Sequence, residues 1–417
     1  MRFSIAVREE SRTNPPLFPA KARCAMQRRK IRDNIHWLGA IDWDRRLFDA
    51  LIPLPDGTSY NAYLIRGSAG IALLDTVDPA MADQLMRQLD GVAAIDYIVC
   101  HHAEQDHSGA LPMVLERFPQ ARVLATPKAK ALLVDHLHLP EDVFVTVADG
   151  ETLSLGDKTL RFIHTPWVHW PETMVTYLVE DRLLFSCDFF GAHRATNDLF
   201  VGDQGLVHEA AKRYFGEIMQ PFRTAIAKNL EKLAGLPIEM IAPSHGQIYD
   251  RPSWIIEAYR DWVLGPPRNL VVFPFISMHG STRLLVDRLT AALTERGVTV
   301  ELFNLAVTDI GKLAMALVDA ATIVVGTPTV LGGPHPLVAH AAFLANALRP
   351  KARYLSVVGS YGWGGKAVET LAGMIPNLKV EVLEPVLCKG LPDQAAFTAL
   401  ERLADEIARR HGESGLQ

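Results

Sequence analysis

The sequence predicts an α/β protein in which a mixed αββα sheet sandwich is followed by a doubly wound parallel sheet. Up to about residue 250, strand-like segments often follow one another directly, with helical segments between some of them. Beyond about residue 267, strands and helices alternate regularly. A chain of 417 residues with 49% hydrophobic residues is long and apolar enough to build both cores.

Short apolar runs mark the strands of the first half, and helical periodicity marks the segments between them. We expect strands at Tyr60–Leu64, Ile71–Leu74, Ile95–Cys100, Val123–Ala125, Leu160–Ile163, Met174–Val179, Arg182–Ser186 and Met240–Ala242. We expect helices at Met81–Leu89, Leu111–Phe118, Ala129–Leu137, Ala210–Leu233 and Trp254–Trp262. Several strands are close neighbours in the sequence, which is typical of a mixed sandwich flanked by helices.

The segment Gly265–Pro267 breaks this pattern, and regular β-α units follow it. We expect strands at Leu270–Phe273, Thr299–Asn304, Thr322–Gly326, Arg353–Val358 and Leu378–Val382. The helices expected between and after them are Leu284–Arg296, Ile310–Asp319, Pro336–Ala347, Lys366–Met374 and Asp393–Arg410. This alternation predicts a doubly wound parallel sheet. The ladder of the first strand should end or bulge at Pro274, because proline has no N–H to donate.

These patterns divide the chain into three parts. Residues 1–28 contain an Asn-Pro-Pro run and scattered charges, so we expect a disordered tail there, with Met26 as a second candidate start. We expect the sandwich to span residues 29–265. The parallel sheet is expected to span residues 268–412.

Composition excludes several classes of function. The formal net charge is -5, without the basic surplus typical of nucleic-acid binding. No apolar run approaches the 18 or so residues of a transmembrane helix, and the N-terminus lacks a secretory apolar stretch. The four cysteines are scattered and form no C-x-x-C pair, which predicts free thiols, a cytoplasmic location and no rubredoxin-type iron site.

The stretch CHHAEQDHSG, directly after an apolar strand, concentrates imidazoles and carboxylates in a few residues. His102, Glu104 and Asp106 alternate, so in an extended segment their side chains project from one side of the backbone. A turn would aim His107 at the same point, and Ser108 is a plausible cap for the helix that follows. A strand end that leads into a helix is where open α/β sheets place their sites.

A lone histidine is more often structural or solvated than a ligand, and His136 and His138, in a leucine-rich helical segment, are interpreted as surface and core packing residues and not as ligands. The opening stretch differs because matching partners exist downstream. His169, Asp188 and His245 each stand at a junction between a strand and a loop. A carboxylate at the end of a buried strand needs a partner, as at Asp188.

The candidate set has four histidines and three carboxylates, which is too many ligands for one ion and suits two. One carboxylate can bridge the two ions and leave three terminal ligands for each. Carboxylates in place of imidazoles add negative charge and hard oxygen atoms, which favours redox-active iron, although carboxylates also serve manganese and zinc.

A second candidate site lies on three loops of the parallel sheet. The first loop comprises Ser277, Met278, His279, Gly280, Ser281 and Thr282, directly before a helix. Later loops contribute Thr327, Pro328 and Thr329, and then Ser360, Tyr361, Gly362, Trp363 and Gly364. Hydroxyl groups at a helix N-terminus can be simple caps, but a lysine-free hydroxyl loop there also suits the phosphate of FMN. Tyr361 and Trp363 offer aromatic surface for an isoalloxazine ring.

The pattern H-x-E-x-D-H, followed by the spaced His169, Asp188 and His245, resembles the flavodiiron protein family, also called A-type flavoproteins. Members join a metallo-β-lactamase-like αββα sandwich to a flavodoxin-like domain. The segments Gly39–Trp43, Ser59–Tyr63 and His169–Met174 also match the family, and the resemblance runs from about Ile31 to near the C-terminus. The resemblance includes no rubredoxin module.

The resemblance implies a ligand set, in which His102, Glu104 and His169 bind one iron, Asp106, His107 and His245 bind the other, and Asp188 bridges. Hydrolytic relatives have histidine where this chain has Glu104. The resemblance also implies that FMN binds the three loops named above, with its phosphate at Ser277–Thr282. The chain departs from the family at His279, where tyrosine is more common.

The resemblance implies an oxidoreductase that reduces dioxygen to water and/or nitric oxide to nitrous oxide at a non-haem diiron centre. Electrons would pass through FMN from an external donor, such as rubredoxin or a flavin reductase, in a head-to-tail homodimer or dimer of dimers. Two alternatives remain at this point. A dinuclear zinc hydrolase with an accessory flavodoxin domain would be expected to lack Glu104, and a plain electron-transfer flavoprotein would not need seven ligands.

Overall fold

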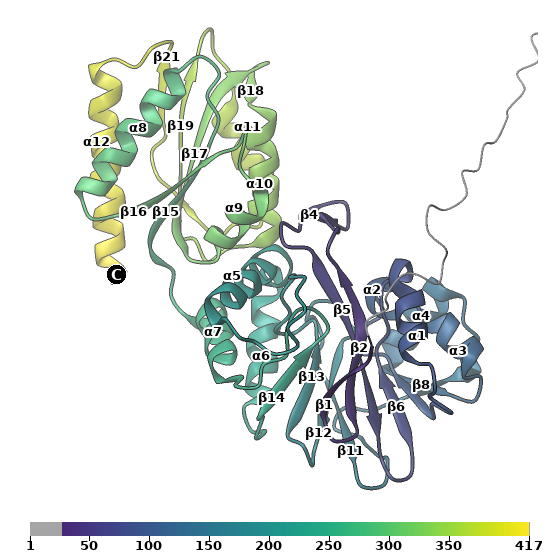
Figure 1. Ribbon diagram of the computed structural model, residues 1–417. Helices are drawn as coiled ribbons and strands as arrows, with labels where there is room; N and C mark the ends of the chain where they lie inside the picture. The colour runs from purple at the N-terminus through teal and green to yellow at the C-terminus, as the bar shows by residue number, and fades with distance from the viewer. Residues whose placement is uncertain (1–26, 417) are drawn as a thin grey trace, which may run out of the picture.

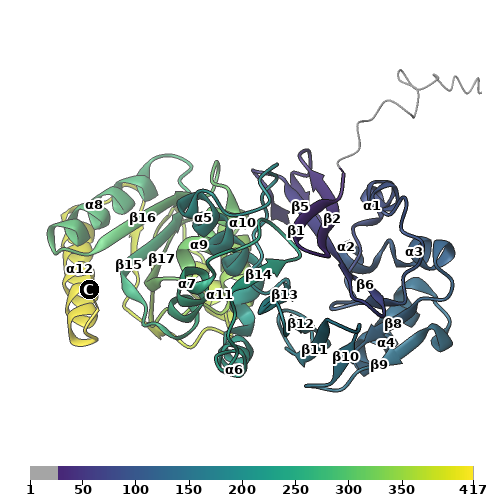
Figure 2. The same cartoon turned by 60° about the horizontal axis from the view of Figure 1, so that its bottom comes forward.

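The computed structural model describes residues 27–416, and its chain forms an αββα sandwich followed by a parallel sheet covered by helices on both faces (Figures 1 and 2). The predicted tail is outside the described residues up to residue 26, as are Cys24 and the candidate start at Met26. Arg28, also predicted to lie in the tail, instead donates hydrogen bonds to the backbone carbonyls of Gln88 and Asp90.

The sandwich is built from two sheets. The first has the order β1-β2-β5-β6-β7-β8-β9 and the second β10-β11-β12-β13-β14. The strands of the first sheet are β1 Arg29–Arg32, β2 Ile35–Asp42, β5 Thr58–Arg66, β6 Ile71–Leu74, β7 Tyr97–Val99, β8 Arg122–Ala125 and β9 Phe144–Thr146. Those of the second are β10 Thr152–Ser154, β11 Thr159–His164, β12 Met174–Leu178, β13 Leu183–Cys187 and β14 Met240–Pro243. Both sheets mix parallel and antiparallel pairs, as predicted.

Helices cover the outer face of each sandwich sheet (Figure 2). The helices along the first sheet are α1 Ala82–Gln88, α2 Gln105–Ser108, α3 Leu111–Arg117 and α4 Pro127–Leu137, with short 3-10 turns at Pro79–Met81 and Glu141–Val143. Those along the second are α5 Gln204–Tyr214, α6 Arg223–Leu233 and α7 Ser253–Leu264. A small hairpin of β3 Leu47–Phe48 and β4 Ile52–Pro53 projects from the edge of the sandwich.

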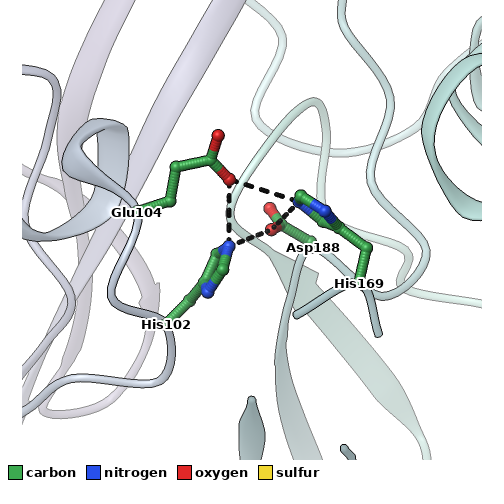
Figure 3. Close-up of side chains that lie close together, drawn as sticks. All are labelled: His102, Glu104, His169 and Asp188. Atoms are coloured by element: carbon green, nitrogen blue, oxygen red, sulfur yellow. Dashed lines mark hydrogen bonds and ion pairs between the residues drawn. The ribbon is translucent and has the colours of Figure 1, made fainter. Parts of the chain in front are cut away.

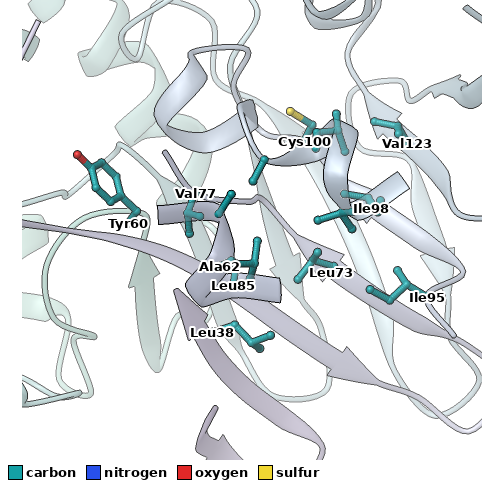
Figure 4. Close-up of a cluster of buried hydrophobic side chains, with 14 of the residues drawn as sticks. Leu38, Tyr60, Ala62, Leu73, Val77, Leu85, Ile95, Ile98, Cys100 and Val123 are labelled. Atoms are coloured by element: carbon teal, nitrogen blue, oxygen red, sulfur yellow. The ribbon is translucent and has the colours of Figure 1, made fainter. Parts of the chain in front are cut away.

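Three apolar layers hold the sandwich together. One lies between the first sheet and its helices, where Leu38, Leu73, Leu85 and Ile98 are fully buried (Figure 4). A second lies between the two sheets, and a third lies under α5 to α7. Burial of this apolar surface is the main favourable term in folding. The layers also fix the strand ends from which the candidate ligands project.

The parallel sheet has the order β16-β15-β17-β19-β20, and every pair along this path is parallel. Its strands are β15 Arg268–Phe275, β16 Thr299–Asn304, β17 Ala320–Val330, β19 Tyr354–Tyr361 and β20 Glu381–Val382, with β18 Gly333–Pro334 beside β17 and β21 Val386–Lys389 beside β19. Its helices are α8 Ser281–Glu295, α9 Ile310–Leu317, α10 Pro336–Leu348, α11 Ala367–Met374 and α12 Gln394–Glu413. The predicted doubly wound topology is confirmed, with α8 and α12 on one face.

The sequence prediction was wrong about the long helix Ala210–Leu233. The structure has α5 and α6 instead, joined by a π-helical turn at Phe215–Met219 and a 3-10 turn at Gln220–Phe222. Pro221 accounts for the break, since a proline inside a helix removes a hydrogen bond and clashes with the preceding turn.

The prediction at Pro274 was also wrong, because β15 continues through it. Pro274 pairs with Phe303 of β16, and Phe275 pairs with Asn304. Pairing with β17 skips Pro274 but resumes at Phe275 with the same offset. The nitrogen of Pro274 faces β17, because Ile276 donates to that side and backbone groups alternate along a strand. The missing N–H therefore costs one bond on one side and does not shift the register.

Among the described residues, Cys100, Cys187 and Cys388 are free, as predicted, and all three are buried. Among residues 27–416, no helix combines the length and apolar character needed to cross a membrane. The change from sandwich to parallel sheet falls between α7 and β15. The domain limits 29–265 and 268–412 stay a prediction.

Candidate functional site

The stretch CHHAEQDHSG lies at the carboxyl end of β7, and its first histidine is structural. The backbone N–H of His101 donates to Oδ1 of Asp75 over 2.8 Å, and its Nδ1 lies 2.6 Å from Oδ2 of the same residue. The Nε2 of His101 lies 2.7 Å from the hydroxyl of Thr176. Both ring nitrogens are therefore occupied, and this residue anchors the strand end.

The expectation of one extended segment from His102 to Asp106 was wrong at its end. Glu104 is extended, but Gln105–Ser108 form the helical turn α2. This turn brings the side chains of Asp106 and His107 close to those of His102 and Glu104, which precede it in the extended backbone. A tight turn directly after a strand thus brings four polar side chains together.

Ser108 has a different role from the predicted cap. Its hydroxyl donates to the carbonyls of Ala103 and Glu104, both over 2.9 Å, and so fastens the turn α2 to the strand end. The following helix α3 has Ala110 at its cap position, without a side-chain cap bond.

The first group of candidate ligands consists of His102, Glu104, His169 and Asp188 (Figure 3). The Oε2 atom of Glu104 lies 3.0 Å from Nε2 of His102 and 3.2 Å from Nε2 of His169. The Oδ2 atom of Asp188 lies 3.5 Å from Nε2 of His102 and 3.4 Å from Nε2 of His169. The four side chains therefore converge on one point from three separate segments.

The second group consists of Asp106, His107 and His245, and the other oxygen of Asp188 faces it. The Oδ1 atom of Asp106 lies 3.2 Å from Nε2 of His107, and its Oδ2 atom lies 3.1 Å from Nε2 of His245. The Oδ1 atom of Asp188 lies 3.0 Å from Nε2 of His107 and 3.4 Å from Nε2 of His245. Asp188 thus directs one oxygen to each group, the arrangement of a bridging carboxylate.

The spacing and burial of these atoms fit metal ions. Bonds of about 2.1 Å to one ion place neighbouring ligand atoms roughly 3.0 to 3.4 Å apart. Within residues 27–416, both oxygens of Asp106 and Asp188 and both nitrogens of His107 are buried without a regular hydrogen bond. Such orphaned polar atoms are costly unless a cation satisfies them. The seven predicted side chains are thus brought together, while their ligand roles stay a prediction.

The ends of β13 and β14 position the candidate ligands from the second sheet. Asp188 follows β13 directly, and the preceding residue Cys187 has a φ of 51°, in the left-handed region that turns the chain sharply. His245 follows β14, and its Nδ1 lies 2.7 Å from the carbonyl of Ser59. His169 lies between β11 and β12.

The opposite charges of the histidines and carboxylates in the cluster shift each other's pKa values. Burial opposes ionisation of Asp188, but the facing His107, His169 and His102 keep its pKa well below the ordinary value. Burial likewise lowers the pKa of His107, but the charges of Asp106 and Asp188 outweigh it and raise this pKa to about 10. Metal binding has to displace such protons, so it releases them and depends on pH.

Sequence reasoning missed two residues at the cluster. Glu172 places Oε1 2.7 Å from Nδ1 of His102 and follows His169 by three residues in the segment that matched the family. Cys187 also lies within reach of His107 and Asp188. Burial raises the pKa of this thiol well above its ordinary value, so it stays protonated.

Aromatic side chains line the His245 side of the cluster. The ring of His193 lies 4.6 Å from that of His245, and Phe48 and Tyr214 lie 5.1 Å and 4.8 Å from His193. Phe48 belongs to β3, so the β3–β4 hairpin lies against this side of the centre. These rings pack around His245.

The three loops predicted to bind FMN lie at one edge of the parallel sheet. Residues 277–280 join β15 to α8, while residues 327–329 and 360–361 belong to the carboxyl-terminal ends of β17 and β19, which are longer than predicted. The hydroxyl of Thr282 lies 3.0 Å from that of Ser360, so the first and third segments meet. Trp363 is 93% exposed and Thr282 is buried. The assignment of FMN to these residues stays a prediction.

Comparisons with known proteins agree with this architecture. A family model described as "ODP family beta lactamase" matches residues 58–246. The coenzyme F420H2 oxidase of Methanothermobacter marburgensis is 34% identical over 401 residues, covering 91% of this chain and 99% of the relative. The anaerobic nitric oxide reductase flavorubredoxin of Escherichia coli is 34% identical over 392 residues, covering 91% of this chain and 82% of the relative.

Solved structures give the same result over nearly the whole chain. The rubredoxin:oxygen oxidoreductase of Desulfovibrio gigas superposes with a TM-score of 0.88 at 31% identity, covering 92% of this chain and 98% of that one. The flavodiiron protein of Giardia intestinalis superposes with a TM-score of 0.85 at 26% identity, covering 94% of this chain and 99% of that one.

The fold and the paired His and carboxylate groups define a redox enzyme with a metallo-β-lactamase-like sandwich and a flavodoxin-like domain. The chain belongs to the flavodiiron protein family, whose cofactors are FMN and a non-haem diiron centre.

Proposed function

We propose that this flavodiiron oxidoreductase reduces dioxygen to water and/or nitric oxide to nitrous oxide, with electrons that an external donor delivers through FMN. The observation that carries the proposal is the bridging position of Asp188 between two groups that each hold two imidazoles and a further carboxylate. The relatives named above include a nitric oxide reductase and a rubredoxin:oxygen oxidoreductase.

In this proposal His102, Glu104 and His169 hold one iron, and Asp106, His107 and His245 hold the other, with Asp188 between them. A diiron centre supplies two electrons together and open positions for a small diatomic ligand, and FMN supplies their replacement. Glu104 and Asp106 each add a negative charge, and such oxygen donors favour the oxidised metal. The chain's own part is to fix the directions of the ligand side chains and to keep them largely buried.

Electron delivery is proposed to cross between subunits. The predicted FMN segments lie at the carboxyl ends of β17 and β19, which Figure 1 shows on the side of the parallel sheet turned away from the sandwich. A head-to-tail homodimer, or a dimer of dimers, would bring the FMN of one subunit to the metal centre of its partner. We propose that an external protein such as a rubredoxin or a flavin reductase is the electron donor.

Anaerobic stopped-flow measurements test the proposal. The protein is purified, iron, zinc and FMN are quantified per chain, and the reduced protein is mixed with dioxygen or nitric oxide in separate runs. Two irons, one FMN and rapid flavin reoxidation by one gas are expected, and the faster gas identifies the preferred substrate. Zinc in place of iron, or a reduced flavin that neither gas reoxidises, would overturn the proposal.

A matched variant links this reaction to the metal cluster. Glu104→Ala removes one proposed iron ligand, whereas Glu180→Ala removes an exposed carboxylate whose Oε2 accepts from the N–H of Thr159. Only the first change is expected to lower the iron content and to slow flavin reoxidation by the preferred gas. Equal behaviour of the two variants would contradict the assignment of Glu104.

A further inference from the structure

A basic cleft lies at the opposite edge of the parallel sheet from the predicted FMN segments. It has a volume of about 780 Å³ and lies where the end of α7, the linker to β15 and the start of α6 meet the amino-terminal ends of β19 and β20. It is therefore separate from both the metal cluster and the predicted FMN site.

Five cationic side chains line this cleft, namely Arg223, Arg349, Lys351, Arg353 and Lys379. Within residues 27–416, none of the five forms an ion pair, and no aspartate or glutamate belongs to the lining. Nearby Arg268 shows the contrast, since it pairs with Asp261 at 3.0 Å and with Asp319 at 3.6 Å. The cleft thus gathers five cations without a paired carboxylate, and the chain offsets their charge only through the more distant Asp319 and Asp261, which act on Lys351.

Two of these cations are held in place by backbone carbonyls. The guanidinium of Arg223 donates to the carbonyl of Arg349 over 3.0 Å. The ammonium group of Lys351 donates to the carbonyl of Gly265 over 2.9 Å and to that of Asp261 over 3.3 Å. Burial lowers the pKa of Lys351 to about 8, and it also lowers the pKa of Arg223. Partly buried like charges in one cleft are stabilised when an anion joins them.

The walls of the cleft are rigid. Pro221, Pro266, Pro267, Pro350 and Pro376 all belong to the lining. Proline fixes its own φ, so these walls do not close easily, and since proline offers no N–H, the donors to a ligand's oxygen atoms come chiefly from the cationic side chains. Leu264 is 62% exposed and adds an apolar surface to the lining. A preformed site of this kind loses little freedom when a ligand binds.

We propose that this cleft binds a small phosphate-rich anion, of the kind formed by the pyrophosphate group of a nucleotide. The volume falls within the range of roughly 300 to 1,000 Å³ that small-molecule sites occupy. Three guanidinium groups offer the forked donors that match phosphate oxygens, and two ammonium groups add point charges. The five cations surround one cleft with proline-rich walls, which suits a compact ligand better than it suits the surface of an acidic protein.

Calorimetric titration of the FMN- and iron-loaded protein with inorganic pyrophosphate tests the proposal. Saturable binding with a stoichiometry of one per chain is expected, because bound FMN already fills the predicted phosphate loop. The double variant R353E/K379E reverses two exposed charges of the lining and is expected to weaken binding at least tenfold. The matched control Lys128→Glu reverses an exposed charge on α4 of the sandwich and should leave binding unchanged.

Parallel titrations with ADP and adenosine distinguish a nucleotide from a bare polyphosphate. Tighter binding of ADP than of pyrophosphate would assign a role to Leu264, while equal binding would place all recognition on the phosphates. Binding that sulfate at the same concentration matches, or that the double variant leaves unchanged, would overturn the proposal. Absence of pyrophosphate binding would overturn the proposal as well. If the double variant then raised the half-saturating concentration of an acidic electron-donor protein, the cleft would instead be a docking site for that protein.

Discussion

Glu172 holds His102 through a buried hydrogen bond of 2.7 Å between Oε1 and Nδ1. The same oxygen accepts the backbone N–H of Ala103 over 3.1 Å, and both side chains are fully buried. The bond places the proton of His102 on Nδ1 and leaves Nε2 to face the cluster. Carboxylates in this position orient a metal-binding histidine and raise its basicity.

Glu172→Gln should therefore weaken iron binding about 10- to 100-fold, the effect that loss of such a partner typically has. The amide keeps the size of the side chain but removes the charge that stabilises the Nδ1 proton. Anaerobic titration of the metal-free protein with ferrous iron against a competing chelator measures the affinity. Glu180→Gln, at an exposed carboxylate, serves as the control, and equal affinities of the two variants would show that Glu172 only packs.

Asp188→Asn should reduce the iron content from two ions per chain to one at most. An amide presents one oxygen and one nitrogen donor group, so it cannot offer an oxygen to both ions. The remaining side chains, including His107 and His245, would then provide too little negative charge around the second ion. Elemental analysis of the purified variant measures the content, with Asp198→Asn at an exposed loop as the control. Retention of two irons would contradict a bridging role.

The seven candidate ligands could be predicted from the sequence because each follows a recognisable strand end. Asp188 stands directly after β13 and His245 two residues after β14, and apolar runs identify such strands well. The geometry was less predictable, since nothing in the order of residues distinguishes the helical turn at Asp106 from an extended path. Ser108, for the same reason, closes that turn instead of capping α3.

Other errors of the sequence prediction arise from contacts between segments that are distant in the sequence. Glu172 was not assigned a role, because a positioning carboxylate follows no spacing rule and its partner His102 lies 70 residues away in the sequence. β2 and β21 escaped prediction, although β2 is a strand of eight residues. The ladder through Pro274 survives because its partner in β16 still pairs with it. Pairing between strands, which decides these cases, cannot be read from one segment alone.

Thr282→Val should weaken FMN binding about tenfold, if the proposed site is correct. The hydroxyl of Thr282 lies 3.0 Å from that of Ser360, which links the segment before α8 to the end of β19. Without this bond, FMN binding itself would have to order the two segments. One such bond contributes about 1 to 1.5 kcal/mol, and 1.4 kcal/mol drawn from binding lowers the affinity tenfold. Quenching of FMN fluorescence by the flavin-free protein measures the affinity.

Thr290→Val is the matched control for this change. Thr290 lies on the same helix, and its hydroxyl donates to the carbonyl of Val286 within α8. The two substitutions make the same chemical change on one helix, but only Thr282 contacts a residue of another proposed FMN segment. Equal FMN affinities would place the flavin away from the Thr282–Ser360 contact.

The parallel sheet should lose stability between about pH 6.5 and pH 4 through His411. Its Nδ1 lies 2.8 Å from Oδ1 of Asn269, and its Nε2 lies 2.7 Å from the hydroxyl of Thr322. Burial, followed by the charge of Arg353, lowers the pKa of His411 from 6.5 to about 4. In this window the unfolded chain binds the proton and the folded chain does not, so the free energy of unfolding falls as the pH falls.

Hydrogen exchange of the amides in β17 and α12 measures this effect separately from the sandwich. His411→Gln should flatten the pH dependence of protection between pH 6.5 and 4, because glutamine does not titrate in this range. His340→Gln, at an exposed position of α10, should keep the wild-type slope. The prediction fails if both variants show the same dependence, which would assign the acid sensitivity of this sheet to other groups.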